Sequence, residues 1–159
     1  MSPQQQLAAF IARYDPAIGA LARAALARLR KRLPGAVELV YDNYNALAIG
    51  FGPSERASEA ILSIALYPRW VSLFFLPGAT LPDPQKLLKG SGARVRHIVL
   101  ASPAVLDERA VRALIAHAVE RAGQPLDGAR RGRIVIRSVS AKQRPRRPAA
   151  RRAPRVQGD

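Results

Sequence analysis

Apolar residues recur at helical spacing in two consecutive segments near the start of the chain. Ser2-Pro3 and Asp15-Pro16 are typical of helix starts, because a capping side chain precedes a proline at the first helical position. Pro34-Gly35 ends the second segment. The apolar positions are Leu7, Phe10 and Ile11 in the first segment, and Ile18, Leu21, Ala22, Ala25, Leu26, Leu29 and Leu33 in the second. The second stripe predicts one long helix with a single buried face.

The middle of the chain changes to short apolar runs separated by turn residues. Such runs predict strands, and short connections between consecutive strands favour antiparallel pairing. The predicted strands are 37–44, 46–51, 60–67, 71–76 and 93–100, with a late sixth strand at 132–138. The run VSLFFL at 71–76 is almost continuously apolar, which indicates a strand buried on both faces.

A turn-rich loop separates the fourth and fifth predicted strands. Pro82 and Pro84 lack backbone N–H groups and exclude a central strand there. Asp83 before Pro84 suits a helix N-cap, so we expect one helical turn over Gln85–Lys89, ended by Gly90-Ser91-Gly92.

A third helical pattern begins after Asp107, which we expect to cap it, and ends before Gly123 and Pro125. Its stripe is Val111, Leu114, Ile115, Ala118 and Val119. These elements predict an α+β fold, in which an antiparallel sheet of about five or six strands packs against helices. The predicted core includes Leu26, Leu29, Ile49, Ile64, Leu73, Phe75, Ile98, Leu114 and Ile115.

Charge divides the chain more sharply than hydropathy does. The chain has 159 residues, which suggests one domain, and a formal charge of +15. Eleven basic residues follow Ala129, opposed only by Asp159. We therefore expect a domain over residues 1–138 and a disordered tail rich in Arg, Pro and Ala over residues 139–159, because the tail has no apolar periodicity.

The basic tail suggests an electrostatic arm for nucleic acid, since each extended cation can approach a phosphate. The residues expected to do so are Lys142, Arg144, Arg146, Arg147, Arg151, Arg152 and Arg155. A solubilising tail with incidental affinity is the open alternative.

The best polar group in the body lies at the end of the first predicted strand. Asp42 and Asn43 stand there between Tyr41 and Tyr44, and a pocket needs a few convergent polar groups beside aromatic ones. We expect ligand contacts from Tyr41, Asp42, Asn43, Tyr44, Trp70 and His97. The alternatives are a plain turn for the Asp and Asn residues, packing for Trp70 and a structural role for His97.

The ordered series of these elements resembles the YdhG-like family of small bacterial domains of unknown function. The resemblance covers roughly residues 10–122. It is carried by Tyr41-Asp42-Asn43-Tyr44, Trp70, VSLFF, Gly78, Leu81, Asp83-Pro84, Leu87-Leu88, Gly90, Gly92, Val95-Arg96-His97-Ile98 and the helix after Asp107. It implies an α+β domain with an antiparallel sheet packed against helices. Some members are named frataxin-like iron chaperones, and most have no assigned activity.

Several chemistries are not expected. Cysteine is absent, which excludes disulfides, thiolate metal sites and a cysteine nucleophile, and which fits a cytoplasmic protein. The frataxin family proper uses an acidic first helix and a neighbouring strand, whereas the first two helices here offer Asp15 among basic residues such as Arg23 and Arg32. We expect no metal site, weak binding of ferrous iron at most, no cofactor, no membrane segment and no catalysis.

The sequence leaves two hypotheses about function. The first is a non-catalytic binding domain that handles a small ligand or metal. The second is a nucleic-acid-associated protein that uses the basic tail as its arm.

Overall fold

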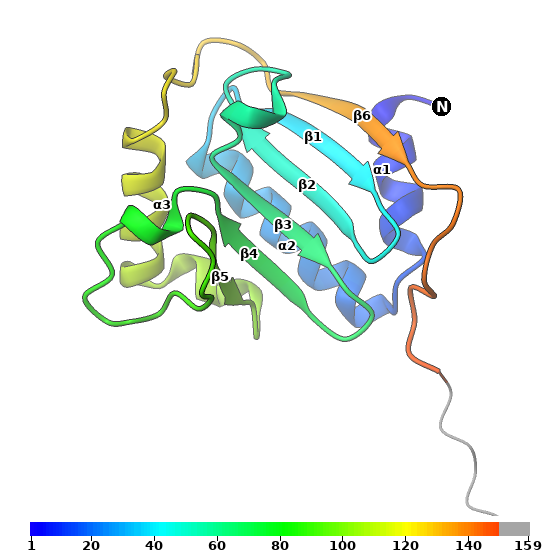
Figure 1. The fold of residues 1–159 in the computed structure, drawn as a ribbon. Helices are drawn as coiled ribbons and strands as arrows, with labels where there is room; N and C mark the ends of the chain where they lie inside the picture. The colour runs from blue at the N-terminus through cyan, green and yellow to red at the C-terminus, as the bar shows by residue number, and fades with distance from the viewer. Residues whose placement is uncertain (150–159) are drawn as a thin grey trace, which may run out of the picture.

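The computed structural model describes residues 1–149, which form a six-stranded sheet with helices (Figure 1). The strands lie in the order β5-β4-β3-β2-β1-β6. The helices are α1 (Pro3–Ala12), α2 (Pro16–Arg32) and α3 (Arg109–Glu120), with short 3₁₀ segments η1 (Ala57–Glu59), η2 (Gly78–Thr80) and η3 (Pro103–Asp107). The strands are β1 (Val37–Asp42), β2 (Leu47–Gly52), β3 (Leu62–Leu66), β4 (Val71–Phe75), β5 (Arg96–Val99) and β6 (Arg133–Val139). The predicted α+β class is confirmed.

The first two helices begin where the sequence signals predict. Ser2 and Gln5 form a capping box in which each side chain accepts from the other residue's backbone N–H, and Pro3 follows at the first helical position. Pro16 plays the same part in α2. The last turn of α2 carries Arg30, Lys31 and Arg32, where cations interact favourably with the negative end of the helix dipole.

The sheet is mixed rather than wholly antiparallel. Strands β1 to β5 pair antiparallel in succession. Short connections predict this for β1–β2 and β3–β4, whereas the long loop between Phe75 and Arg96 separates β4 from β5. Strand β6 pairs parallel to β1, with Val37 opposite Arg133 and a register shift between Val40 and Tyr41. The chain reaches β6 only after α3, so this pairing needs a long crossover. No hairpin turn in the sequence could therefore indicate it.

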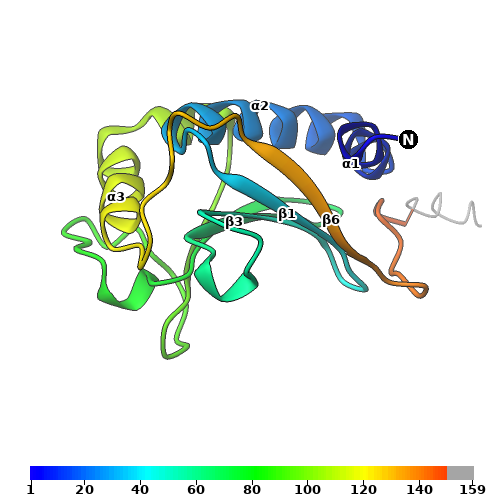
Figure 2. The same ribbon diagram turned by 90° about the horizontal axis from the view of Figure 1, so that it is seen from above.

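The two faces of the sheet are covered differently. Helices α1 and α2 lie over one face, α3 packs at one end, and no helix among the described residues covers the other face (Figure 2). All nine residues predicted for the core are buried. Leu73 on β4 has none of its surface exposed, and Phe75 on the same face is equally buried.

Two local predictions are wrong. Gln85–Lys89 contains no helical turn, because the Asp83 carboxylate instead accepts hydrogen bonds from the backbone N–H groups of Leu87 and Leu88, both at 2.9 Å. Asp107 does not cap α3. It ends η3 and pairs with Arg28 at 3.0 Å, and Glu108 stands at the cap position.

The segment after β6 also departs from expectation. Residues 139–149, predicted to be part of a disordered tail, lie against the β1–β2 turn, and we name residues 140–149 the clasp. Its backbone N–H groups at Ser140 and Arg144 donate to the carbonyl oxygens of Asp42 and Tyr44, each at 2.9 Å. Residues 150–159, including the predicted phosphate contacts Arg151, Arg152 and Arg155, lie outside the described residues.

Candidate functional site: the open face of the sheet

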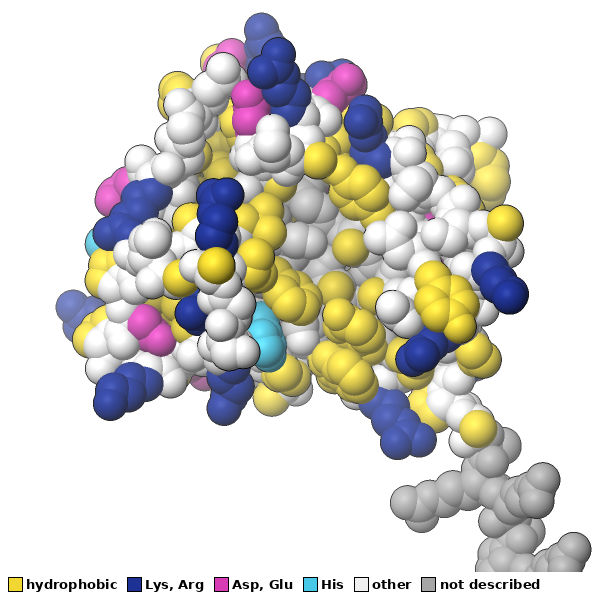
Figure 3. Space-filling view, in the orientation of Figure 1, with side chains coloured by type: hydrophobic (Ala, Val, Ile, Leu, Met, Phe, Trp, Pro, Cys, Tyr) yellow, Lys and Arg dark blue, Asp and Glu magenta, His cyan; other side chains and the backbone are white. Residues whose placement is uncertain are grey.

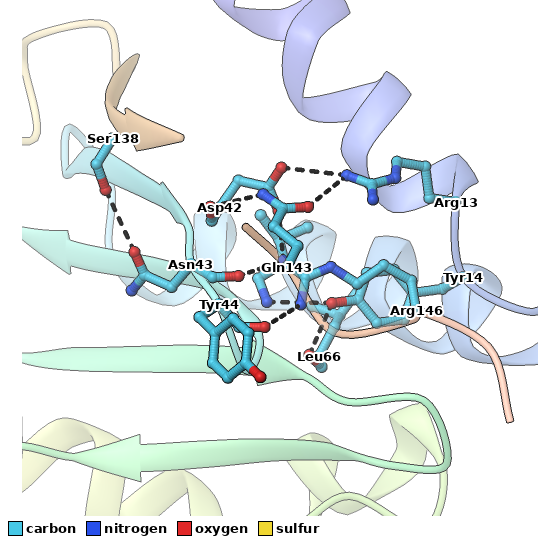
Figure 4. Close-up of polar contacts among 10 residues, drawn as sticks. Arg13, Tyr14, Asp42, Asn43, Tyr44, Leu66, Ser138, Gln143 and Arg146 are labelled. Atoms are coloured by element: carbon cyan, nitrogen blue, oxygen red, sulfur yellow. Dashed lines mark hydrogen bonds and ion pairs between the residues drawn. The ribbon is translucent and has the colours of Figure 1, made fainter. Parts of the chain in front are cut away.

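Asp42, at the end of β1, is the centre of a buried ion-pair network (Figure 4). Its Oδ1 accepts from Nη2 of Arg146 at 2.9 Å, and its Oδ2 accepts from Nη1 of Arg13 at 3.4 Å. The side chains of Asp42 and Arg146 are each only 2% exposed. A predicted ligand contact and a predicted phosphate contact are therefore bound to each other.

The clasp is held by further contacts around this pair. Arg146 also donates to the backbone carbonyls of Asn43 and Tyr44. Gln143 donates from Nε2 to the Asp42 carbonyl at 2.9 Å and accepts from Arg13 at 2.7 Å. The clasp thus occupies the polar positions that the sequence suggested for a ligand.

Tyr14 lies beneath the network, and the sequence analysis did not single it out. Its hydroxyl donates to the Leu66 carbonyl at 3.0 Å and accepts from the Leu47 N–H at 3.1 Å. The Arg146 guanidinium lies 5.8 Å from the centre of the Tyr14 ring. Tyr14 therefore ties the start of β2 to the end of β3 directly under the clasp.

The pKa of the Tyr14 hydroxyl is raised above its usual 10.0, chiefly by burial, although the charge of Arg146 opposes the rise. A raised folded-state pKa stabilises the fold below the unfolded pKa and loses that contribution as pH rises above it. We expect the free energy of unfolding to fall above about pH 10, and Tyr14→Phe to remove part of that fall. The measurement is urea denaturation at neutral and alkaline pH.

Tyr44→Phe is the matched control, because Tyr44 is 46% exposed. Tyr44→Phe should lose as much unfolding free energy at alkaline pH as the unmodified chain does. At neutral pH Tyr14→Phe should still cost about 1–3 kcal/mol, because it removes two buried hydrogen bonds. If Tyr14→Phe lost as much unfolding free energy at alkaline pH as the unmodified chain does, ionisation of the Tyr14 hydroxyl would not explain that loss.

The uncovered face of the sheet is hollowed (Figure 3). A cavity of about 490 Å³ lies there, which we name the sheet hollow. Its floor consists of small side chains that β2 and β3 present away from the helices: Ala48, Ser63 and Ala65. Its rim is formed by Asn43, Tyr44, Asn45, Ala46, Tyr67, Phe74 and, from the clasp, Ser140. Because the floor residues are small, the aromatic side chains of the rim stand above the sheet.

Aromatic side chains are unusually accessible around the sheet hollow. Trp70 is 43% exposed and stacks on Tyr67 with ring centres 4.6 Å apart. Phe74 lies 5.5 Å from His97 across the β4–β5 pair. Arg144 lies over the Tyr44 ring, 5.5 Å from its centre. Of the predicted ligand contacts, Tyr44 and Trp70 are thus on one exposed surface, with His97 at its margin.

The remaining predicted ligand residues differ in exposure: Asn43 is exposed, whereas Tyr41 and Asp42 are not. Tyr41 is half-buried in β1, and the Asn43 side chain accepts from the Ser138 hydroxyl at 3.3 Å. Among residues 1–149 no group of three or more His, Cys, Asp or Glu side chains could hold a metal ion.

The surroundings of the sheet hollow are positive. Residues 1–149 hold 23 of the 26 basic residues and 10 of the 11 acidic ones. Most carboxylates are already paired or hydrogen-bonded, as Asp42 and Glu38 are. Within the described part of the chain, no ion pair joins Arg69, Lys142 or Arg144 to a carboxylate. Arg69 precedes the exposed Trp70, and the other two belong to the clasp.

Comparisons with protein-family models, with curated proteins and with solved structures found no match to this chain. Across residues 1–149, no helix combines the length and apolar character needed to cross a bilayer. The site must therefore be interpreted from its own geometry.

Proposed function

We propose that this domain binds single-stranded nucleic acid across the sheet hollow. Tyr44, Trp70 and Phe74 would stack on bases, while Arg69, Lys142 and Arg144 would contact phosphates. The observation that carries the proposal is the hollowed sheet face, where exposed aromatic rings stand beside cations that form no ion pair with a carboxylate of residues 1–149. This combination is typical of proteins that bind single strands by stacking and charge.

The geometry favours a single strand over a duplex. A base offers its flat face for stacking only when it is not paired inside a helix. The small floor residues Ala48 and Ala65 leave room for a planar ring between Tyr44 and Tyr67. Duplex DNA would meet only the nearby cations Arg69, Lys142 and Arg144.

The clasp changes the earlier hypothesis of a free basic arm. Arg146 is 4% exposed and bound to Asp42, so it is not available to a phosphate. Arg147 donates to the Arg13 carbonyl at 3.2 Å and lies 3.8 Å from Asp15. Lys142 and Arg144 are both exposed, and Arg144 lies over the ring of Tyr44 at the sheet hollow.

The alternative of a small ligand or metal held by Tyr41, Asp42 and Asn43 has weaker support. Asp42 is occupied by two arginines, and the described residues offer no cluster of metal-ligating side chains. A free planar metabolite in the sheet hollow remains the competing occupant. Comparing a mononucleotide with an oligonucleotide distinguishes the two.

The test uses the single tryptophan as an internal probe. A short labelled oligothymidylate is titrated into the full chain, and both its anisotropy and the Trp70 fluorescence are recorded. We expect Trp70 to be quenched and Tyr44→Ala to weaken binding roughly 5- to 150-fold, since a stacked base contributes about 1–3 kcal/mol. Arg69→Ala should reduce the salt slope by about 0.7.

Arg109→Ala is the charge-matched control, because Arg109 lies at the start of α3 beside Arg32 rather than at the sheet hollow. It should leave the salt slope unchanged. Duplex binding as tight as single-strand binding, without Trp70 quenching, would contradict stacking on the sheet. A mononucleotide that binds as tightly as the oligonucleotide would favour the small-ligand hypothesis instead.

A further inference from the structure

A second cavity lies on the opposite side of the sheet, between the helices and the β1–β6 edge. Figure 2 shows α1 and α2 on the same face, above β1 and β6. The cavity measures about 580 Å³, and we name it the helix-side crevice. Its apolar lining includes Leu7, Ala8, Ile11, Leu26, Phe51 and Ile134. It shares no lining residue with the sheet hollow.

Two features of the backbone shape the walls of this space. The parallel strand β6 extends the sheet beyond β1, and its helix-side residue Ile134 is only partly buried. At the other end the lining includes Gly35 and Gly132, which contribute no side chain. Gly35 has φ 77°, and the Asp127 carbonyl oxygen lies 1.9 Å from where its Cβ would stand, so larger residues are excluded there.

The charged side chains of the crevice differ in whether they form an ion pair. Glu38 is 5% exposed and accepts two hydrogen bonds from Arg30, at 2.9 and 2.8 Å. Hydrogen bonding to Glu38 raises the pKa of Arg30, and the opposite charges of the two side chains offset each other. Arg23 is on the same side of α2, two turns earlier, and no ion pair joins it to a carboxylate among residues 1–149. The crevice therefore carries one uncompensated positive charge.

Gly19 leaves room for the Arg23 guanidinium. Its Nη1 lies 3.1 Å from where a Cβ on Gly19 would stand, and the neighbouring Ile11 side chain is 3.5 Å from that point. A side chain at residue 19 would push the guanidinium away from this place. Glycine at residue 19 thus allows a cation to lie next to Ile11 of α1.

We propose that the helix-side crevice binds an aliphatic chain with a single anionic headgroup, such as a carboxylate, with the headgroup on Arg23. Apolar side chains would surround the chain, and burying each CH₂ favours binding by roughly 0.8 kcal/mol. An arginine fork matches a carboxylate in shape and charge. The volume lies within the range of about 300–1,000 Å³ common for small-molecule sites.

The test is isothermal titration calorimetry of the full chain with dodecanoate below its micelle concentration. We expect saturable binding of one molecule per chain. Arg23→Ala should weaken it at least about tenfold, as loss of a charge-assisted hydrogen bond implies. Dodecanol and dodecylammonium, which share the chain but not the negative charge, should bind at least about tenfold more weakly for the same reason.

Neighbouring alanines on α1 provide a matched pair of variants. Ala8 lines the crevice and is itself exposed at its mouth, whereas the adjacent, equally exposed Ala9 does not line it. Ala8→Phe should abolish dodecanoate binding, and Ala9→Phe should preserve it, with thermal unfolding confirming that both variants fold. Absence of binding would overturn the proposal. So would dodecanoate binding that survives both Arg23→Ala and Ala8→Phe, or dodecylammonium binding as tight as that of dodecanoate.

Discussion

Replacing Arg146 with alanine is expected to lower the free energy of unfolding by about 3–5 kcal/mol. The substitution leaves the Asp42 carboxylate, on a side chain that is 2% exposed, without its buried partner. Arg13 cannot replace it, because its side chain is 49% exposed and lies 3.4 Å from the carboxylate. Urea denaturation of the full chain measures the loss.

Arg147→Ala is the control, since Arg147 is adjacent in the clasp but has a side chain that is 55% exposed. It should change stability by less than about 0.5 kcal/mol, as is usual for surface positions. The double variant Asp42→Leu with Arg146→Leu should lose less than Arg146→Ala alone, because no buried charge is left unpaired. Equal stability of Arg146→Ala and the unmodified chain would mean that the clasp is not bound in solution.

Replacing Leu73 with alanine should lower the free energy of unfolding by about 2–5 kcal/mol. Leu73 is fully buried on the helix side of β4, and its removal leaves a cavity that the neighbouring side chains fill only in part. Its neighbour Phe74 points the other way, towards the sheet hollow. Variants of these two residues therefore distinguish an effect on stability from an effect on the proposed binding.

Phe74→Ala should cost less stability than Leu73→Ala, because the ring is only half-buried, and it should weaken oligonucleotide binding. Leu73→Ala should bind normally under conditions where it is folded. Chemical denaturation and anisotropy on the same two proteins provide the comparison. A Leu73→Ala loss of less than about 1 kcal/mol would contradict the packing described for β4.

Periodic apolar patterns predicted most of the fold. The stripe on α2 and the runs that became β1 to β5 each report local spacing, and local spacing determines which face is buried. The alternation at β6 also predicted a late strand, which the structure places at Arg133–Val139. Its parallel partner was not predictable, because pairing across the length of the chain leaves no local pattern.

The clasp was missed for a related reason. Composition rich in Arg, Pro and Ala suggests disorder because it offers no apolar surface to bury. Residues 140–149 are instead held by polar groups, above all the pair between Arg146 and Asp42. The sequence predicted a ligand contact at Asp42 and a phosphate contact at Arg146. Nothing in their spacing indicates that the two side chains pair with each other.

The candidate site was predicted in part. Exposed Tyr44 and Trp70 were singled out, and they do lie on one surface. The small floor of the sheet hollow was not recognised, although Ala48, Ser63 and Ala65 alternate with large apolar residues along β2 and β3. That alternation was an available signal for an uncovered face. The helix-side crevice left no comparable pattern, since its walls come from five separate elements, α1, α2, β1, β2 and β6.

The parallel pairing of β1 with β6 has a consequence for biosynthesis. Val37 pairs with Arg133, so nearly the whole chain must be translated before the outer edge of β1 finds its partner. At elongation rates of about 5–20 residues per second, that edge stays open on the ribosome for on the order of 5–20 s. An open strand edge is a template for wrong pairing with other chains. The nascent chain is thus most vulnerable to aggregation just before β6 emerges, when α1, α2, α3 and strands β1 to β5 are already available to fold.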